Sequence, residues 1–167
     1  MTPEIVPVWK AVTPAIAAGL DELWARSGAV PDGAGRATRA AQAVCIARDP
    51  ARPDAILAVG TAVVRVLPRL RQPMYYYRQY FADEFRGGRQ TVPFFNRARQ
   101  ALQEYNAALE RPEALGVLLE IENPMLAKRY DRAVESDAGS VFIGYSPRGL
   151  QLRVSYFDDA RLLPPAG

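Results

Sequence analysis

Residues 72–123 restrict the fold most strongly, because two apolar strand patterns flank a turn and the longest helix pattern of the chain. "QPMYYYRQYFAD" is rich in aromatic residues, and "ALGVLLEIEN" has a nearly continuous apolar core, which is typical of a central strand. Between them, "TVPFFNRARQALQEYNAALE" places an apolar stripe on one helix face, made of Phe94, Phe95, Ala98, Leu102, Tyr105 and Leu109. The strand-helix-strand unit over 74–122 predicts a right-handed crossover between two parallel strands.

The flanking sequence adds helices and hairpins to this unit. Thr13 and Pro14 are suited to the start of a helix that Gly28 ends, and Pro7 marks the segment before it as an edge strand. We expect a Gly-rich loop at 29–38, a hairpin at 39–67, a helix at 123–136, a closing hairpin at 140–157 and a loose tail at 162–167. The predicted fold class is α+β: a mixed, mostly antiparallel sheet of about seven strands flanked by helices, in a single domain over 1–167.

The composition excludes several kinds of chemistry. The chain has no histidine and one cysteine, so it cannot use a Ser-His-Asp or Cys-His mechanism, and we expect no metal site. Cys45 lies in the apolar run "AQAVCIA" and is expected to pack as a small hydrophobic residue. The formal net charge of +3 is too small to indicate a nucleic-acid partner, although it would favour an anionic ligand.

The segment "FADEFRGGRQTVPFF" joins the first of these strands to the long helix, and it has two interpretations. In the first, Gly87 and Gly88 let the backbone turn tightly, Arg86 and Arg89 supply positive charge, and the amides at the helix start bind a pyrophosphate. In the second, Thr91 caps a helix, the glycines only turn the chain, and the arginines face water.

At this segment the chain resembles the GNAT superfamily of acyl-CoA-dependent acyltransferases. The family motif often has the form V-x-P-E-Y-R-G-x-G-x-G/A, and "FADEFRGGRQT" follows it at Phe81, Glu84, Phe85, Arg86 and Gly87. After the next strand the family often has an Asn, a small residue and then a Tyr, and "NPMLAKRY" provides Asn123, Ala127 and Tyr130. The expected order of strands and helices is similar to that of the family over nearly the whole chain.

The resemblance implies an acyl-CoA cofactor, either acetyl-CoA or another acyl-CoA. In a family member the cofactor lies where the fourth and fifth strands splay apart. Main-chain groups near Phe81 and Asp83 would pair with the pantetheine arm, and the amides from Gly87 to Thr91 would hold the pyrophosphate. The cofactor-binding residues expected on this basis are Phe81, Asp83, Arg86, Gly87, Gly88, Arg89, Gln90, Thr91 and Asn123.

The resemblance also implies direct transfer of the acyl group to an amine in a ternary complex. Tyr130 would protonate the leaving thiolate, and its alternative is a partly buried tyrosine that packs on the sheet. Glu120 could accept a proton from the acceptor amine, and its alternative is a solvent-facing or arginine-paired carboxylate. Glu84 is a weaker candidate, and a chain of waters could replace a fixed base.

Two positions depart from the family motif. Arg89 and Thr91 stand where the motif usually has small residues, which allow the backbone to approach the pyrophosphate closely. Arg89 could bind phosphate oxygens instead, because a guanidinium suits that geometry. The departures leave a second interpretation open: a GNAT-like module without catalysis that binds CoA weakly or not at all and acts through partners.

The sequence identifies partners only by class. The acceptor is expected to be an amine of a small molecule or a peptide, with no nucleic acid and no membrane, and a homodimer is left open. Tyr75, Tyr76 and Tyr77 could stack on nucleic-acid bases, but strand alternation sends them to both faces of the sheet, so at least one face is expected to be core. A cytoplasmic location is the expectation for a chain without a disulfide framework.

Overall fold

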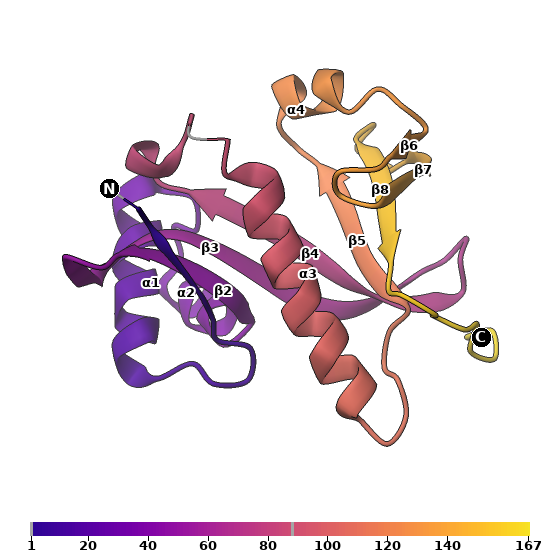
Figure 1. The fold of residues 1–167 in the computed structure, drawn as a ribbon, viewed down its shortest axis with the longest axis horizontal. Helices are drawn as coiled ribbons and strands as arrows, with labels where there is room; N and C mark the ends of the chain where they lie inside the picture. The colour runs from indigo at the N-terminus through magenta and orange to yellow at the C-terminus, as the bar shows by residue number, and fades with distance from the viewer. Residues whose placement is uncertain (1, 88) are drawn as a thin grey trace. The chain divides into compact units, whose positions relative to one another are not determined.

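The computed structural model describes residues 2–87 and 89–167, and Figure 1 shows the ribbon. In chain order its elements are β1 (Glu4–Pro7), α1 (Pro14–Ser27), α2 (Gly33–Ala40), β2 (Ala43–Asp49), β3 (Arg52–Leu67), β4 (Gln72–Phe81), a 3₁₀ turn (Asp83–Phe85), α3 (Thr91–Ala108), β5 (Gly116–Ile121), α4 (Pro124–Arg129), β6 (Val134–Glu135), β7 (Ser140–Tyr145) and β8 (Gln151–Tyr156). None of the helices in these residues is long and apolar enough to cross a membrane.

The strands form a mixed eight-stranded sheet in the order β1-β2-β3-β4-β5-β8-β7-β6. β4 and β5 pair in parallel, as the strand-helix-strand unit predicts, whereas β5 with β8, β8 with β7, and β1 with β2 pair antiparallel. β1 lies at one end of the order and contains Pro7, so the predicted edge strand is confirmed. The α+β class and the mostly antiparallel sheet are therefore confirmed, with one short strand, β6, more than expected.

The chain divides into two compact units, and each is described by itself. The first contains Met1–Ala62 and Gln79–Leu102, and the second contains Val63–Arg78 and Gln103–Gly167. The loop that follows β4 belongs to the first unit. The parallel β4–β5 pairs, α4 and β6 to β8 belong to the second unit.

Local capping residues define α1 in the first unit. The Thr13 hydroxyl accepts a hydrogen bond from the Ile16 amide at 3.2 Å, Pro14 occupies the first turn, and Gly28 ends the helix with φ +72°. Its apolar face contributes to a core cluster with residues of β2 and β3, beside which Figure 1 shows α1 and α2. The fully buried members of this cluster from α1, β2 and β3 include Leu20, Leu23, Trp24, Ile46 and Val59.

The loop predicted at 29–38 is wrong in its second half, because α2 begins at Gly33. The Asp32 carboxylate accepts a hydrogen bond from the Gly35 amide at 2.9 Å and so caps the helix start. Arg36 then pairs with Asp21 of α1 at 2.7 Å, which ties the two helices together. Tertiary contact therefore compensates for the low helix propensity of the two glycines in α2.

Close packing of β5 on β8 explains the glycine that starts β5 in the second unit. A Cβ atom on Gly116 would collide with the Ser155 carbonyl oxygen, and every other residue type carries a Cβ atom. The connection before it is fixed by Asn106, whose amide nitrogen donates to the Ala114 carbonyl at 2.9 Å and whose oxygen accepts from the Glu113 amide at 2.8 Å.

The expectation of a loose C-terminal tail is wrong. The Gln72 side chain donates to the Leu163 carbonyl and accepts from the Leu163 amide, both at 2.9 Å. Arg71 donates to the Ala166 carbonyl through its side chain at 2.8 Å. The tail is thus anchored to the turn between β3 and β4.

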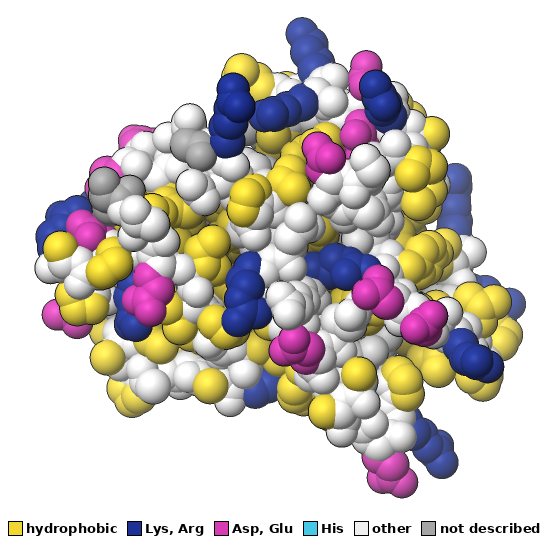
Figure 2. Space-filling model, in the orientation of Figure 1, with side chains coloured by type: hydrophobic (Ala, Val, Ile, Leu, Met, Phe, Trp, Pro, Cys, Tyr) yellow, Lys and Arg dark blue, Asp and Glu magenta, His cyan; other side chains and the backbone are white. Residues whose placement is uncertain are grey.

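Cys45 lies in β2 and is buried, as its apolar run predicts. Burial raises the pKa of its thiol to about 12, so the thiol stays protonated at neutral pH. No group of three or more His, Cys, Asp or Glu side chains in the described residues could hold a metal ion. Figure 2 shows Lys and Arg interspersed with Asp and Glu on the visible face, in agreement with the small net charge.

Candidate functional site

The loop after β4 has the backbone geometry of a tight turn into a long helix. Gly87 has φ +82° and Arg89 has φ +56°, both in the left-handed region, and the Gly88 prediction lies outside the described residues. A Cβ atom on Gly87 would meet nothing within 4 Å, so its surroundings are open. The left-handed backbone conformation of Arg89 is about 1 kcal/mol less favourable than the same conformation of glycine, so this turn lowers the stability of the fold.

The helix start differs by one residue from the sequence expectation. The Gln90 carbonyl accepts the first intrahelical hydrogen bond, from the Phe94 amide at 2.9 Å, so Gln90 precedes the helix and Thr91 is its first residue. The prediction that Thr91 caps the helix is therefore wrong. Pro93 lies in the first turn as expected and has no amide hydrogen, which leaves the amides of Thr91 and Val92 as the first-turn donors.

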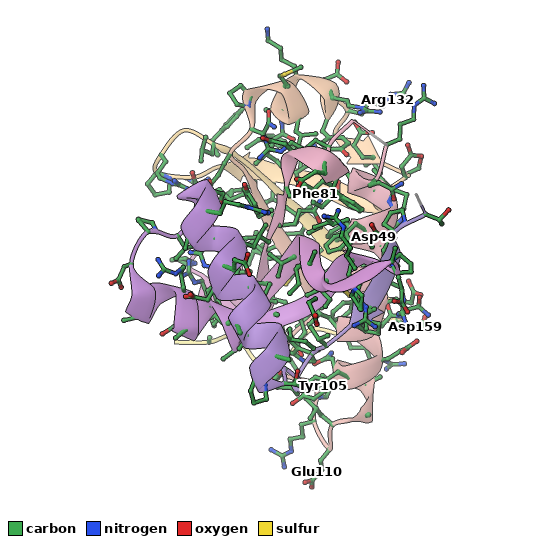
Figure 3. The ribbon with its side chains drawn as sticks, turned by 90° about the vertical axis from the view of Figure 1, so that its left-hand side faces the viewer. Asp49, Phe81, Tyr105, Glu110, Arg132 and Asp159 are labelled. Atoms are coloured by element: carbon green, nitrogen blue, oxygen red, sulfur yellow. The ribbon has the colours of Figure 1, made fainter. Side chains whose placement is uncertain are left out.

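Three aromatic rings fix the base of this loop. The ring of Phe81, labelled in Figure 3, lies edge-to-face against Phe85 at 4.9 Å and against Phe94 at 5.3 Å between centroids. Phe85 and Phe94 are buried. Such pairs contribute about 0.5–1.5 kcal/mol each beyond their buried area, so the two ends of the loop are held together by packing.

Arg86 is already engaged within the loop. Its Nε donates to the Phe81 carbonyl at 2.9 Å, Nη1 lies 3.0 Å from the Asp83 carboxylate, and the guanidinium lies 5.6 Å from the Tyr80 ring centroid. The Arg86 and Asp83 side chains are 56% and 91% exposed, so this ion pair stabilises the protein by at most about 1 kcal/mol. In this arrangement the Phe81 carbonyl, expected to bind the pantetheine arm, is occupied by Arg86.

Arg89 differs from Arg86 in having no hydrogen-bond or ion-pair partner within the part of the chain that the structure describes. It is exposed and directly precedes Gln90 and the first turn of α3. A free guanidinium beside helix amides provides donors for an anion such as a phosphate group.

β4 and β5 stop pairing before either strand ends. The parallel pairs are Tyr75 with Val117, Tyr76 with Leu118 and Tyr77 with Leu119. β4 continues to Phe81 and β5 to Ile121. The predicted splay is present, and the pairing ends earlier than the expected positions of Phe81 and Glu120.

Glu120 is an arginine-paired carboxylate. Its side chain is 11% exposed, and Oε1 accepts from the Arg148 Nη2 and from the Tyr76 hydroxyl, each at 2.8 Å. Arg148, and then the hydroxyl groups of Ser146 and Tyr76, lower its pKa to about 2 against the opposing effect of burial. A carboxylate that holds its charge so firmly is a weak base, and this geometry matches the ion-paired alternative.

Asn123 and Tyr130 mark the two ends of α4. The Asn123 side-chain oxygen accepts from the Met125 amide at 2.9 Å, so its expected capping role is confirmed. The helix predicted over 123–136 is wrong in its second half: it ends at Arg129, and Tyr130 directly follows it. Tyr130 is half-buried, and burial raises the pKa of its hydroxyl, with a smaller opposing effect from Arg129.

A buried arginine that the sequence analysis missed explains why α4 is short. Arg153 on β8 is 1% exposed, and its Nη2 donates to the Arg132 carbonyl at 2.9 Å and the Ala133 carbonyl at 3.3 Å. Its Nε donates to the Ser140 hydroxyl at 2.8 Å. These bonds draw the backbone after Tyr130 onto β8. Figure 3 labels Arg132 in this segment.

The register separates Glu120 from the arginine that holds the segment after Tyr130. Glu120 pairs with Leu152 of β8, and Leu119 pairs with Arg153, so Glu120 and Arg153 point to opposite faces. The half-buried Tyr130 follows α4 in the segment that Arg153 holds. Tyr130 therefore lies in the segment bound by Arg153, whereas Glu120 is bound by Arg148 and Tyr76. Among the described residues, no hydrogen bond joins Tyr130 to Glu120.

Neither a protein-family model nor a curated protein matches the sequence. Solved structures, by contrast, match the fold of almost the whole chain. A GNAT-family acetyltransferase from Streptococcus pneumoniae matches with a TM-score of 0.55 and 11% identity, covering 94% of this chain and 100% of that chain. A bacterial toxin matches with a TM-score of 0.56 and 13% identity, covering 93% of this chain and 90% of that chain. The chain therefore has a GNAT-like fold, as its motifs predict.

Proposed function

We propose that the chain is an acyl-CoA-dependent N-acyltransferase that moves an acyl group directly to an amine of a small molecule or a peptide. The observation that carries this proposal is the β4–β5 ladder of a GNAT-like fold, which stops at Tyr77 and Leu119 while both strands continue. β4 then leads through a left-handed turn into the start of α3.

The residues of the loop fit the pyrophosphate of CoA. Gly87 turns the chain in open surroundings, and Arg89 offers a guanidinium that has no partner among the described residues. The amides of Thr91 and Val92 lie in the first turn of an 18-residue helix. Acyl-CoA would supply a thioester, which is activated for attack by an amine. Arg86 would exchange its contacts with Phe81 and Asp83 for the ligand, because both contacts are exposed and weak.

Tyr130 is the proposed proton donor. Burial raises the pKa of its phenol, which therefore remains protonated at neutral pH and can donate to a leaving thiolate. Its hydroxyl makes no protein hydrogen bond within the described residues, so no protein group competes for the proton. The low pKa of Glu120 argues against it as the base, and we propose that water removes the proton from the acceptor amine.

Ligand-dependent unfolding tests the cofactor, and an acceptor screen tests the reaction. Acetyl-CoA at one hundred times its Kd should stabilise the protein by about 2.7 kcal/mol and raise Tm. Release of free CoA thiol should then identify acceptors within a panel of amines and peptides. A protein whose Tm is unchanged by CoA and by acetyl-CoA would overturn the proposal.

A second candidate, a GNAT-like module without catalysis, is favoured by one observation. Arg89 places a long charged side chain in the left-handed position where the family motif has a small residue. Binding of acetyl-CoA without transfer to any acceptor of a broad panel would support this module over the enzyme.

A further inference from the structure

Two guanidinium groups lie over the ring of one tyrosine in the second unit, and a third is linked to its hydroxyl through a carboxylate. Arg65 of β3 lies 4.4 Å and Arg78 of β4 lies 5.0 Å from the centroid of the Tyr76 ring. The third, Arg148, reaches the same tyrosine through Glu120, whose Oε1 accepts from both. Cation–π contacts of this kind place positive charge over the ring in a defined position.

The tyrosine is a fixed and buried support for these groups. Tyr76 is 7% exposed, and its hydroxyl donates to Glu120 at 2.8 Å. It belongs to a core cluster that also contains Met74, Leu118 and Leu152. The position of the ring is therefore set by packing on one side and by a charge-assisted hydrogen bond on the other.

The carboxylates of this cluster are already used by one arginine. A single nitrogen of Arg148, Nη2, lies 2.8 Å from Glu120 and 2.9 Å from Glu122. Arg65 and Arg78 have no carboxylate within salt-bridge distance among residues 2–87 and 89–167. Two like charges are thus held against one ring, and no carboxylate of the described residues lies within salt-bridge distance of either. An anion between or beside them would relieve their repulsion.

We propose that Arg65 and Arg78 form an anion-binding site that holds a carboxylate or phosphate group of the acceptor. Arg65 is exposed and Arg78 is half-buried, so their planar forks, which suit these oxyanions, are open to solvent. This inference rests on the proposed function for its ligand, whereas the anion site itself rests only on the arrangement around Tyr76.

The position of the site on β4 and β5 supports an acceptor as its ligand. Tyr76 is paired with Leu118, and the next pair, Tyr77 with Leu119, is the last of the ladder. Alternation places Arg78 and Glu120 on the same face as Tyr76, one residue beyond that last pair. The anion site therefore borders the point where β4 and β5 stop pairing, which is the feature on which the proposed transfer depends.

Titration with inorganic phosphate, without CoA, tests the site by NMR of the arginine Nε–H groups. The Arg65 and Arg78 signals should shift together with one Kd, separately from those of Arg86 and Arg89. Replacement of both by glutamine (R65Q/R78Q) should weaken this Kd at least tenfold, since a hydrogen bond to a charged group is typically worth about a factor of ten or more. R111Q is the matched control, because Arg111 is an exposed arginine elsewhere in the same unit. Equal shifts at all exposed arginines, or an unchanged Kd in R65Q/R78Q, would overturn the site.

Paired acceptors test the ligand separately. Each acceptor that carries a carboxylate or phosphate should have a KM at least tenfold higher with R65Q/R78Q than with the parent, whereas its neutral amide or ester analogue should show the same KM with both. The KM of R78K for a charged acceptor should lie between those of the parent and of R65Q/R78Q, because lysine keeps the positive charge but lacks the planar guanidinium fork. Equal changes for charged and neutral acceptors would overturn the acceptor assignment.

A parent that acylates nothing while Arg65 and Arg78 bind phosphate would reject the proposed function and retain the anion site for a ligand other than an acceptor. Unchanged unfolding temperatures would confirm that the variants remain folded.

Discussion

The two loops that carry the proposed site residues are held in opposite ways. In the first unit, the loop after β4 is tied down by Arg86 and Asp83, whose side chains are mostly exposed, and it contains a left-handed arginine. In the second unit, the segment after α4 is bound to Arg153, a guanidinium that is 1% exposed. Weak, exposed bonds would let the first loop reorganise around the proposed ligand, whereas buried bonds hold the second segment in one conformation.

The largest expected effect comes from removing the buried arginine. Arg153→Met should destabilise the protein by about 3 kcal/mol or more, because the Ser140 hydroxyl and the carbonyls of Arg132 and Ala133 lose a buried donor. Urea unfolding measures this change. A loss below about 1 kcal/mol would mean that the segment after Tyr130 is not held by Arg153.

Removing one oxygen from the preformed segment should change the rate and leave the fold intact. Tyr130→Phe should lower kcat by about a hundredfold at neutral pH, in line with a typical general-acid contribution. Stability and acetyl-CoA affinity should stay close to those of the parent, because the hydroxyl makes no protein hydrogen bond within the described residues. Full activity in this variant would exclude Tyr130 as the proton donor.

The ion pair between Glu120 and Arg148 should stabilise the protein more than the exposed pair between Arg86 and Asp83, because the Glu120 side chain is mostly buried. Glu120 has a folded pKa of about 2, below its ordinary value of 4.5, chiefly because of Arg148. Its stabilisation is fully present above pH 4.5 and is lost as the pH falls toward 2. Glu120→Gln should therefore cost about 1–2 kcal/mol at pH 7, after allowance for solvent screening, and much less near pH 2. A difference from the parent that is the same at both pH values would contradict this ionic role.

The smallest effect on stability should come from the exposed loop. Arg86→Ala with Arg89→Ala should change the free energy of unfolding by less than about 1 kcal/mol. The same double variant should bind CoA more weakly and with a smaller dependence on salt, because the two charges that are proposed to face the phosphates are removed. Calorimetric titrations at two salt concentrations measure both quantities. If the affinity and its salt dependence match those of the parent, the two arginines take no part in binding.

Features determined by neighbouring residues could be predicted from the sequence. Thr13, Pro14 and Gly28 define α1 through local geometry, and the parallel β4–β5 pairing follows from the helix that connects the two strands. The Asn123 cap is equally local.

Features determined by distant contacts could not be predicted in the same way. Gln151, Arg153 and Ser155 alternate with apolar residues on β8, which is the pattern of a solvent-facing strand surface. Arg153 is buried only because the segment after α4 folds over it, and the same bonds end that helix before Tyr130. The hydrogen bonds between Gln72 and Leu163 likewise join residues 91 positions apart, so no local pattern reveals them.

The buried thiol of Cys45 has a practical consequence for spectroscopy. It is the only cysteine of the chain, and a pKa of about 12 leaves almost no thiolate to react with maleimide or methanethiosulfonate reagents at neutral pH. A cysteine introduced at an exposed position, such as Glu84 in the first loop or Asp131 in the second, should therefore take up a fluorophore or spin label selectively. Each labelled protein would report the motion of one loop alone, with the native cysteine left in place.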